Sequence, residues 1–275
     1  MRRPPYLPFL NGPPAFEVGL RPIAPDSWLI PDVEAHWLAE KRALLAARPA
    51  AVLAETAGSA AAQAEALMLA QAAAPAANFG AVGLSPLARA AHAVSDDFCV
   101  MEKRGGAWVL SAAALCAPTY WSLAANIGGP LTHLHGPVPD RLGPGGAQGL
   151  AQRIARIFDA VAADSVLERF NWTVQAGGAH FTPDGAPLRA LAEAAPESEA
   201  ASLLHLRVER QTVRRLPETG GVLFTIRVTL DPLVAVFAEP GAKAALTQAW
   251  RAAPAHVRAY KKWAAYERLM AAALA

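Results

Sequence analysis

The sequence has very little cysteine and no long apolar run. Its 275 residues include two cysteines, Cys99 and Cys116, which lack the Cys-X-X-Cys spacing of zinc and redox sites. Arg, Gln, Glu or Pro interrupts each apolar stretch before the roughly 18 residues that a membrane-spanning helix needs. No uninterrupted apolar core or small-residue cleavage site comes after the basic N-terminus. We therefore expect buried, reduced thiols, no membrane segment and a cytoplasmic protein.

An excess of one charge is also missing. The formal net charge is +2, and basic and acidic residues are interspersed, so the sequence shows no nucleic-acid-binding patch and no acidic tail. It also lacks Gly-X-Ser-X-Gly, His-Glu-X-X-His and a phosphate loop that ends in lysine. The sequence therefore carries no common hydrolase, zincin or nucleotide-binding signature. Its binding partners have to be inferred from individual sites.

The N-terminal region reads as an extended arm followed by helices. Residues 1–31 are rich in proline, and Phe9, Phe16 and Trp28 are the expected anchors of this arm. A helical pattern begins at Asp32, the predicted N-cap, and an alanine-rich helix is predicted over about 60–74. These helices should form a layer over one face of the rest of the domain.

Strand patterns dominate the middle of the chain. Alternating or short apolar runs bounded by glycine or proline predict strands over 97–103, 107–111, 170–174, 203–213 and 222–230. We expect a helix opening at Pro118, a glycine-rich flexible linker over 143–149, an amphipathic helix over about 150–161 and a polar loop over 177–198. The prediction is one α+β domain over 1–275, with the arm and helical layer in about 1–94, an antiparallel sheet of about five strands, and C-terminal helices in about 240–275.

Two histidines stand next to a proline-rich turn. His133 and His135 lie two residues apart and precede Gly136-Pro-Val-Pro139, which cannot continue a helix or an interior strand because each proline fixes φ and lacks an amide donor. A ligand held on such a stiff segment loses little entropy when it binds a metal or a haem iron. The alternative is that both are polar loop residues before a turn.

An arginine ends an otherwise apolar strand face. Leu204, Leu206 and Val208 share a face with Arg210, so this guanidinium needs an anionic partner such as a carboxylate. A haem propionate is the ligand that we predict. The alternatives are an internal acid such as Glu168 or Asp231, or a position at the sheet edge. On the neighbouring strand Arg227 falls on the face opposite the apolar one and by itself predicts a solvated residue.

The chain resembles the alpha subunits of haem-dependent oxidative N-demethylases. The resemblance lies in Leu134-His-Gly-Pro-Val-Pro139, in Arg169-Phe-Asn-Trp172 and in the long, compositionally unusual segment 206–227, and it runs over roughly 16–260. It implies a PAS-like sheet that holds haem b, and a histidine-ligated iron that activates dioxygen. It also implies oxidation of a small methylated amine with release of formaldehyde. Electrons would come from NADPH through reductase subunits carrying flavin and an iron–sulfur cluster.

The resemblance also implies roles for single residues. His135 occupies the histidine of the Pro-Val-Pro motif and is the expected axial ligand, and Arg210 and Arg227 match motif arginines as haem-contact or pocket residues. The motif's Thr-Tyr is replaced here by Val228-Thr229, and Asp140 stands where a glycine is common. We therefore expect a substrate preference different from that for dimethylamine.

Two other classes of protein fit the same residues. A PAS-like fold serves equally well in a non-catalytic haem-binding or gas-sensing module, since fold does not decide function. A structural or ligand-binding subunit, with His135 as an ordinary turn residue, is the third interpretation.

Overall fold

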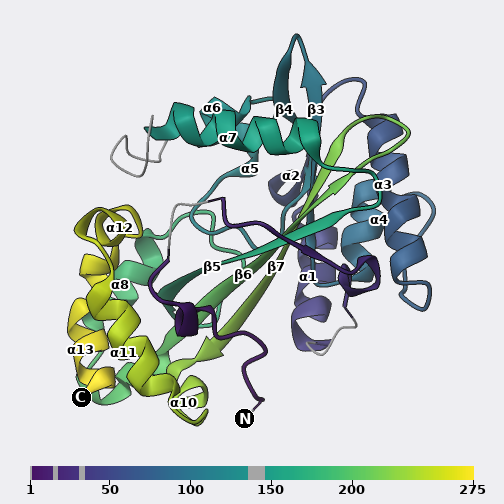
Figure 1. Ribbon diagram of the computed structural model, residues 1–275. Helices are drawn as coiled ribbons and strands as arrows, with labels where there is room; N and C mark the ends of the chain where they lie inside the picture. The colour runs from purple at the N-terminus through teal and green to yellow at the C-terminus, as the bar shows by residue number, and fades with distance from the viewer. Residues whose placement is uncertain (1, 15–17, 31–34, 136–145) are drawn as a thin grey trace.

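A seven-stranded sheet organises the part of the chain that the computed structural model describes, residues 2–14, 18–30, 35–135 and 146–275 (Figure 1). The strand order is β1-β5-β6-β7-β3-β4-β2, and all neighbouring strands are antiparallel. The strands are β1 (Arg21–Ile23), β2 (Leu53–Glu55), β3 (Asp97–Arg104), β4 (Ala107–Ala114), β5 (Val166–Ala176), β6 (Leu204–Arg215) and β7 (Val222–Pro232). The fold is α+β, as expected.

The sheet is larger than the five strands predicted. The two additional strands, β1 and β2, are three residues long and close the two edges of the sheet against β5 and β4. Three residues are too short to show a period-two pattern. Pro22 lies in β1, where a missing amide donor is tolerated because the strand is at an edge.

The two predicted hairpins are confirmed. Gly105 and Gly106 both have positive φ, 56° and 83°, and turn β3 into β4 between the paired Arg104 and Ala107. The second hairpin joins β6 to β7 and includes Gly220 at φ 74°. Glycine takes such angles without the strain that a Cβ would cause.

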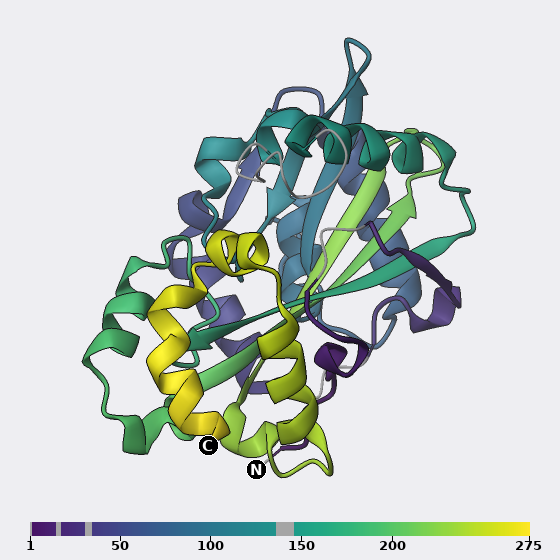
Figure 2. The ribbon, with the colours of Figure 1, turned by 60° about the vertical axis from the view of Figure 1, so that its left-hand side comes forward.

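Helices lie around the sheet in three groups. The N-terminal helices lie on one side, the helices between β4 and β5 lie beside the β3–β4 hairpin, and those after β7 lie around the far ends of β5 and β6 (Figures 1 and 2). The helices are α1 (Ala35–Ala47), α2 (Pro49–Val52), α3 (Ala60–Ala73), α4 (Pro86–Ala93), α5 (Leu123–Asn126), α6 (Leu131–Leu134), α7 (Gly146–Ala160), α8 (Ala186–Ala194), α9 (Ala200–Leu203), α10 (Leu233–Val236), α11 (Ala242–Ala252), α12 (Ala255–Tyr260) and α13 (Glu267–Leu274). In the described part of the chain, no helix has the length and apolar character that a membrane crossing requires.

Each group of helices has its own apolar core. The N-terminal group packs with Trp28 and Phe98 against the sheet, and the C-terminal group packs with Phe9 and Trp172 around Trp263. Phe9 and Trp28 are almost fully buried, which confirms two of the three predicted arm anchors. The third anchor, Phe16, and the predicted N-cap Asp32 lie outside the described residues.

Three local predictions were wrong. The segment expected to be a polar loop contains α8, which begins with a proline in its first turn, a position where the missing amide costs nothing. Helix α7 already begins at Gly146, so the end of the expected flexible linker is helical, and residues 143–145 lie outside the described part. The helix expected to open at Pro118 is the single turn α5, which begins at Leu123.

Both cysteines are buried as expected. Cys99 lies in β3 and Cys116 comes after β4, and both thiols are free. Burial raises the pKa of each thiol, so both are protonated and unreactive near neutral pH.

Candidate functional site

His135 sits at the end of a one-turn helix. Pro130 precedes α6, and the backbone amide of His135 donates to Leu131 O at 3.0 Å, so the residue caps the turn. The imidazole is partly buried, and its Nδ1 lies 2.8 Å from the same carbonyl oxygen. Since a carbonyl can only accept, Nδ1 carries the proton and Nε2 is the atom with a lone pair. The remaining residues of the motif, together with the segment up to residue 145, are outside the described part.

His133 is bound differently. Its side chain is exposed, and its Nε2 lies 3.1 Å from Ala125 O at the end of α5. That nitrogen is therefore the donor of a backbone hydrogen bond. Of the two histidines, only His135 combines partial burial with a second ring nitrogen fixed by the backbone, as metal-ligating histidines usually do.

The surroundings of His135 favour a neutral ring. Burial lowers the pKa of the imidazole, the Leu131 carbonyl raises it, and the charge of Arg169 lowers it. A metal binds the neutral imidazole and competes with protons for it. His135 is therefore in the state that an axial ligand requires at neutral pH.

Polar residues occupy one face of the paired strands β5 and β6. The register places Arg169 opposite Gln211, Asn171 opposite Glu209, and the following Thr opposite Arg207. Alternate residues of a strand point to the same side of a sheet, so these side chains share one face. We call Arg169, Asn171, Arg207, Glu209 and Gln211 the excess-charge face.

Glu209 is the central acceptor of this face. Its carboxylate accepts hydrogen bonds from the Thr119 hydroxyl, from Asn171 Nδ2 at 3.2 Å and from Gln211 Nε2 at 2.8 Å. Burial by itself would raise the pKa of this carboxyl, but the hydrogen bonds and the charges of Arg207 and Lys261 hold it below its usual value. Glu209 is ionised.

Lys261 approaches the same cluster from the C-terminal helices. It comes directly after α12, is buried, and donates from Nζ to Asn171 Oδ1 at 3.0 Å. Burial lowers its pKa to about 8, against the attraction of Glu209, and the charge of Arg169 lowers it further. An ammonium group thus lies beside the sheet at neutral pH.

Arg207 is buried completely, with uncharged partners. It donates to Thr119 Oγ1 at 2.8 Å, to Gln175 Oε1 at 3.0 Å and to Ala117 O at 2.7 Å, and two longer contacts reach His180 O. Its donors are used, but among the described residues no carboxylate forms an ion pair with it.

Among the described residues, Arg169 has neither a hydrogen-bond acceptor nor a carboxylate partner. It is partly buried, and it forms no hydrogen bond or ion pair with any residue that the structure describes. Helix α6 packs on this side of the sheet, because Leu131 shares an apolar cluster with Val213, which points to the same side of β6 as Glu209 and Gln211. The charge of Arg169 lowers the pKa of His135, as expected for groups on one side of the sheet. Burial lowers the pKa of the guanidinium itself, and the charge of Glu209 opposes this.

The two arginines predicted from the sequence lie on the opposite side of the ladder. Arg210 donates to Glu168 Oε1 at 2.6 Å and to the carbonyl oxygens of Trp28 and Ser27 at 2.7 and 2.6 Å. The internal acid Glu168, one of the alternatives, is therefore its partner. A haem contact for Arg210 stays a prediction.

The strand face of Arg227 predicted a solvated residue, and this prediction was wrong. It is 2% exposed, and it donates to Asp96 Oδ2 from Nε at 2.9 Å and from Nη2 at 2.6 Å. The register places it directly opposite Arg210. We call Glu168, Arg210, Asp96 and Arg227 the paired-charge face. The error arose because a single strand cannot show that both sides of the sheet are covered.

Sequence reasoning also missed the excess-charge face. The available signal was that polar residues alternate with period two in two strands that then pair, at 169, 171, 173 and 175 and at 205, 207, 209 and 211. Each strand separately is typical of a solvent-facing side. The pairing, and Lys261 at a distance of 90 residues from Asn171, appear only in the fold.

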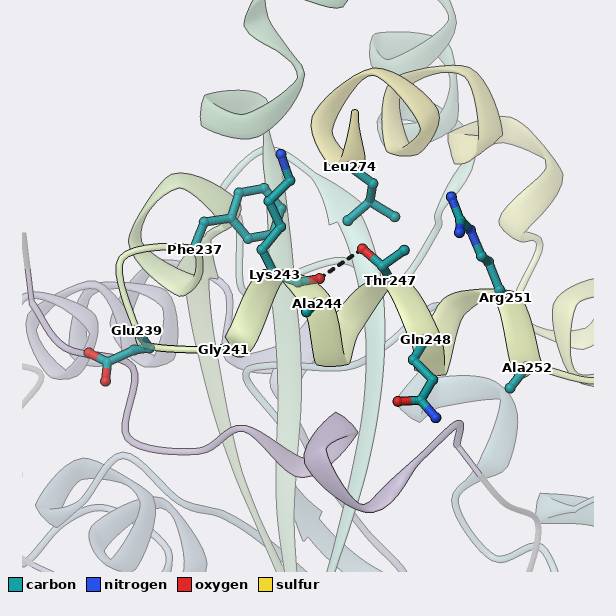
Figure 3. A pocket seen from close by; sticks show the side chains of 10 residues that line it. All are labelled: Phe237, Glu239, Gly241, Lys243, Ala244, Thr247, Gln248, Arg251, Ala252 and Leu274. Atoms are coloured by element: carbon teal, nitrogen blue, oxygen red, sulfur yellow. Dashed lines mark hydrogen bonds between the residues drawn. The ribbon is translucent and has the colours of Figure 1, made fainter.

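Other features of the described residues do not add a metal or ligand site here. They contain no group of three or more His, Cys, Asp or Glu that could hold a metal ion. A broad, open pocket of about 950 Å³ lies on the C-terminal helices, between Phe237, Lys243, Thr247 and Leu274 (Figure 3). None of its lining residues belongs to the cluster around His135.

Residues 71–271 match the family described as haem-dependent oxidative N-demethylase, alpha subunit-like. The match covers most of the chain and includes α6, the whole β5–β6–β7 ladder and Lys261. The chain belongs to this family, which confirms the resemblance found in the sequence. The family description names a haem-dependent oxidative enzyme and a subunit of a larger assembly.

Proposed function

From this membership, we propose that the protein is the haem-binding oxygenase subunit of an oxidative N-demethylase that acts on a small methylated amine. The observation that carries the proposal is His135, whose Nδ1 is fixed by Leu131 O, which leaves Nε2 as the nitrogen with a lone pair. A single, histidine-ligated iron in a porphyrin needs one such nitrogen. It does not need a cluster of three protein ligands.

The residues around His135 fit a haem b. The second ring nitrogen of a ligating histidine normally donates to a carbonyl or carboxylate, as Nδ1 does here, which fixes the tautomer and raises the basicity of the ligand. Bound haem would supply the activation of dioxygen that removal of an N-methyl group as formaldehyde requires. His135 would hold it, and the hydrogen-bonded side chains around Glu209 would line the same side of the sheet.

The arrangement of strands supports a PAS-like domain. Hairpin β3–β4 is followed by a helical connection, and the antiparallel strands β5, β6 and β7 then return so that β7 pairs with β3. We infer that 1–275 form one haem-binding domain, since a single sheet links the N-terminal and C-terminal helices. The family motif also predicts that Arg210 and Arg227 contact haem, although Glu168 and Asp96 already neutralise their charges within the fold.

Two electrons per turnover have to come from outside the described residues. The two cysteines are buried on β3 and after β4, and an iron–sulfur cluster needs four cysteine ligands in most cases. We propose that NADPH supplies these electrons through partner subunits with flavin and an iron–sulfur cluster, in the cytoplasm.

The test is a panel of methylated amines. Haem-loaded protein, dioxygen and a chemical reductant or the natural reductase should release formaldehyde from at least one small secondary or tertiary methylamine. The reaction should stop when the amine is replaced by its demethylated analogue. A stable haem that binds dioxygen, but gives no formaldehyde from any amine, would establish the gas-binding sensor and reject the enzyme.

A further inference from the structure

The excess-charge face, together with Lys261, carries more positive than negative charge. Arg169, Arg207 and Lys261 are cations, and Glu209 is the one carboxylate that acts on all three. The other carboxylate that acts on Arg207, Asp97, forms its own ion pair with the buried Lys41, at 3.1 Å. Among the described residues, two positive charges therefore remain without an anion.

Folding alone gives no reason for this imbalance. Taking a charge out of water is unfavourable unless an opposite charge and hydrogen bonds replace the lost solvent. Glu168 and Asp96 do this for Arg210 and Arg227 on the paired-charge face. The same strands thus show that this protein balances its buried arginines where the role is structural.

Arg169 is the cation whose donors are available. The donors of Arg207 go to Thr119, Gln175 and backbone carbonyl oxygens, so its contribution to a ligand is its charge. Lys261 gives one hydrogen bond, to Asn171, out of the three that an ammonium can donate. Arg169 gives none to any described residue, although a guanidinium can bind a carboxylate through two parallel hydrogen bonds.

We propose that Arg169, with Lys261 beside it, binds the propionate carboxylates of the haem that His135 ligates. The two propionates carry the two negative charges that this face lacks. Propionate binding, which the sequence predicted for Arg210, is then the role of Arg169 on the other side of the ladder. This inference rests on the proposed function, because it requires that haem binds at His135.

The test compares haem with its dimethyl ester, in which both propionates have lost their charge. Apoprotein is titrated with each, and Soret absorbance gives the dissociation constant. Wild type should bind haem more tightly than the ester. Arg169→Leu should weaken haem binding about ten- to a hundredfold, the range of charge-assisted hydrogen bonds, and should leave binding of the ester unchanged. Arg169→Lys should recover part of the loss.

Two controls make the result specific. Arg156 lies on the exposed side of α7, and Arg156→Leu removes an equal charge away from His135, so its haem affinity should equal that of wild type. Lys261→Met should weaken haem binding by a smaller factor than Arg169→Leu, again with no change for the ester. Urea unfolding of each apoprotein checks that the variants are folded.

Three other outcomes would contradict this inference. If Arg169→Leu binds haem as tightly as wild type, this inference is wrong and the haem site at His135 stands. If haem and ester weaken equally, Arg169 has a structural role and the inference is also wrong. Failure of the wild-type protein to bind haem at all would overturn the proposed function together with this inference.

Discussion

The two faces of the β5–β6–β7 ladder place arginines in opposite electrostatic situations. On the paired-charge face, Arg210 and Arg227 lie directly opposite each other and each binds its own buried carboxylate. On the excess-charge face, Arg169 has no partner among the described residues, and Lys261 binds only the neutral amide of Asn171. Basic side chains on the same sheet are thus neutralised by carboxylates of the fold on one side, and are not fully neutralised on the other.

This difference separates structure from function more reliably than residue type does. Two like charges on directly opposed residues destabilise a sheet unless each is neutralised, which explains why both Glu168 and Asp96 are buried beside the arginines. On the excess-charge face, Glu209 can neutralise only one of the charges of Arg169, Arg207 and Lys261. The helix that ends at His135 packs on this same side of the sheet. An incomplete buried charge set beside a candidate ligand marks where a charged ligand would bind.

The largest effect is expected from Arg227→Leu. The substitution leaves Asp96, which is 1% exposed in its side chain, without the guanidinium that now lies 2.6 Å away. Breaking one half of a buried ion pair typically costs about 3–5 kcal/mol in the free energy of unfolding. Urea unfolding measures this, with the exposed Arg156→Leu as the control, for which the change should be under about 0.5 kcal/mol. A loss as small as that of the control would return Arg227 to the solvated role that the sequence predicted.

Thr212→Val should have a smaller effect on the same face. Trp28 Nε1, in a fully buried ring, donates to Thr212 Oγ1 at 3.0 Å and thereby fixes the N-terminal arm to the sheet. An indole N–H left without an acceptor costs about 1–2 kcal/mol in unfolding free energy. Thr212→Ser keeps the oxygen and should restore most of this stability. A small loss in Thr212→Val together with a larger loss in Thr212→Ser would mean that the methyl group, and not the hydrogen bond, is what matters.

The smallest effect concerns Lys261 and depends on pH. The pKa of about 8 lies below the usual 10.5, so between these values the unfolded chain binds a proton that the folded protein has lost. Stability from this residue therefore rises with pH, by about 1 kcal/mol between pH 8 and pH 9. Lys261→Met should lack this rise and should be at least as stable as wild type at pH 7.

The check is urea unfolding of both proteins at pH 7, 8 and 9. The buried thiols of Cys99 and Cys116, with raised pKa values, oppose the trend at alkaline pH, but they are common to both proteins and cancel in the difference. An identical pH dependence of wild type and Lys261→Met would show that Lys261 is not a buried cation.

Much of the fold is encoded in local patterns. The glycine turn at 105–106, the alternating runs of β6 and β7 and the alanine-rich α3 are each written in consecutive residues, and all three were predicted. The three-residue edge strands were not, since they exist only because β4 and β5 offer unpaired edges. Helix α8 was missed because the prolines and polar residues of the surrounding segment, 177–198, suit a loop.

The candidate site was predictable only in part. His135 was found because its motif is contiguous, and its hydrogen bond to Leu131 spans a single turn. Arg169, Glu209 and Lys261 come from three segments that meet only after strand pairing and helix docking. A buried charge is a property of its environment, and one strand at a time does not reveal that environment.

The most direct test of the central proposal is a haem titration of the apoprotein followed by visible absorption. Wild type should take up one haem and show a Soret band of a histidine-ligated iron that shifts on reduction. His135→Ala should lose this band and bind haem at least about a hundredfold more weakly. His133→Ala should behave as wild type, because Nε2 of His133 already donates to Ala125 O. A His135→Ala protein with full haem content and an unchanged Soret band would contradict the assignment.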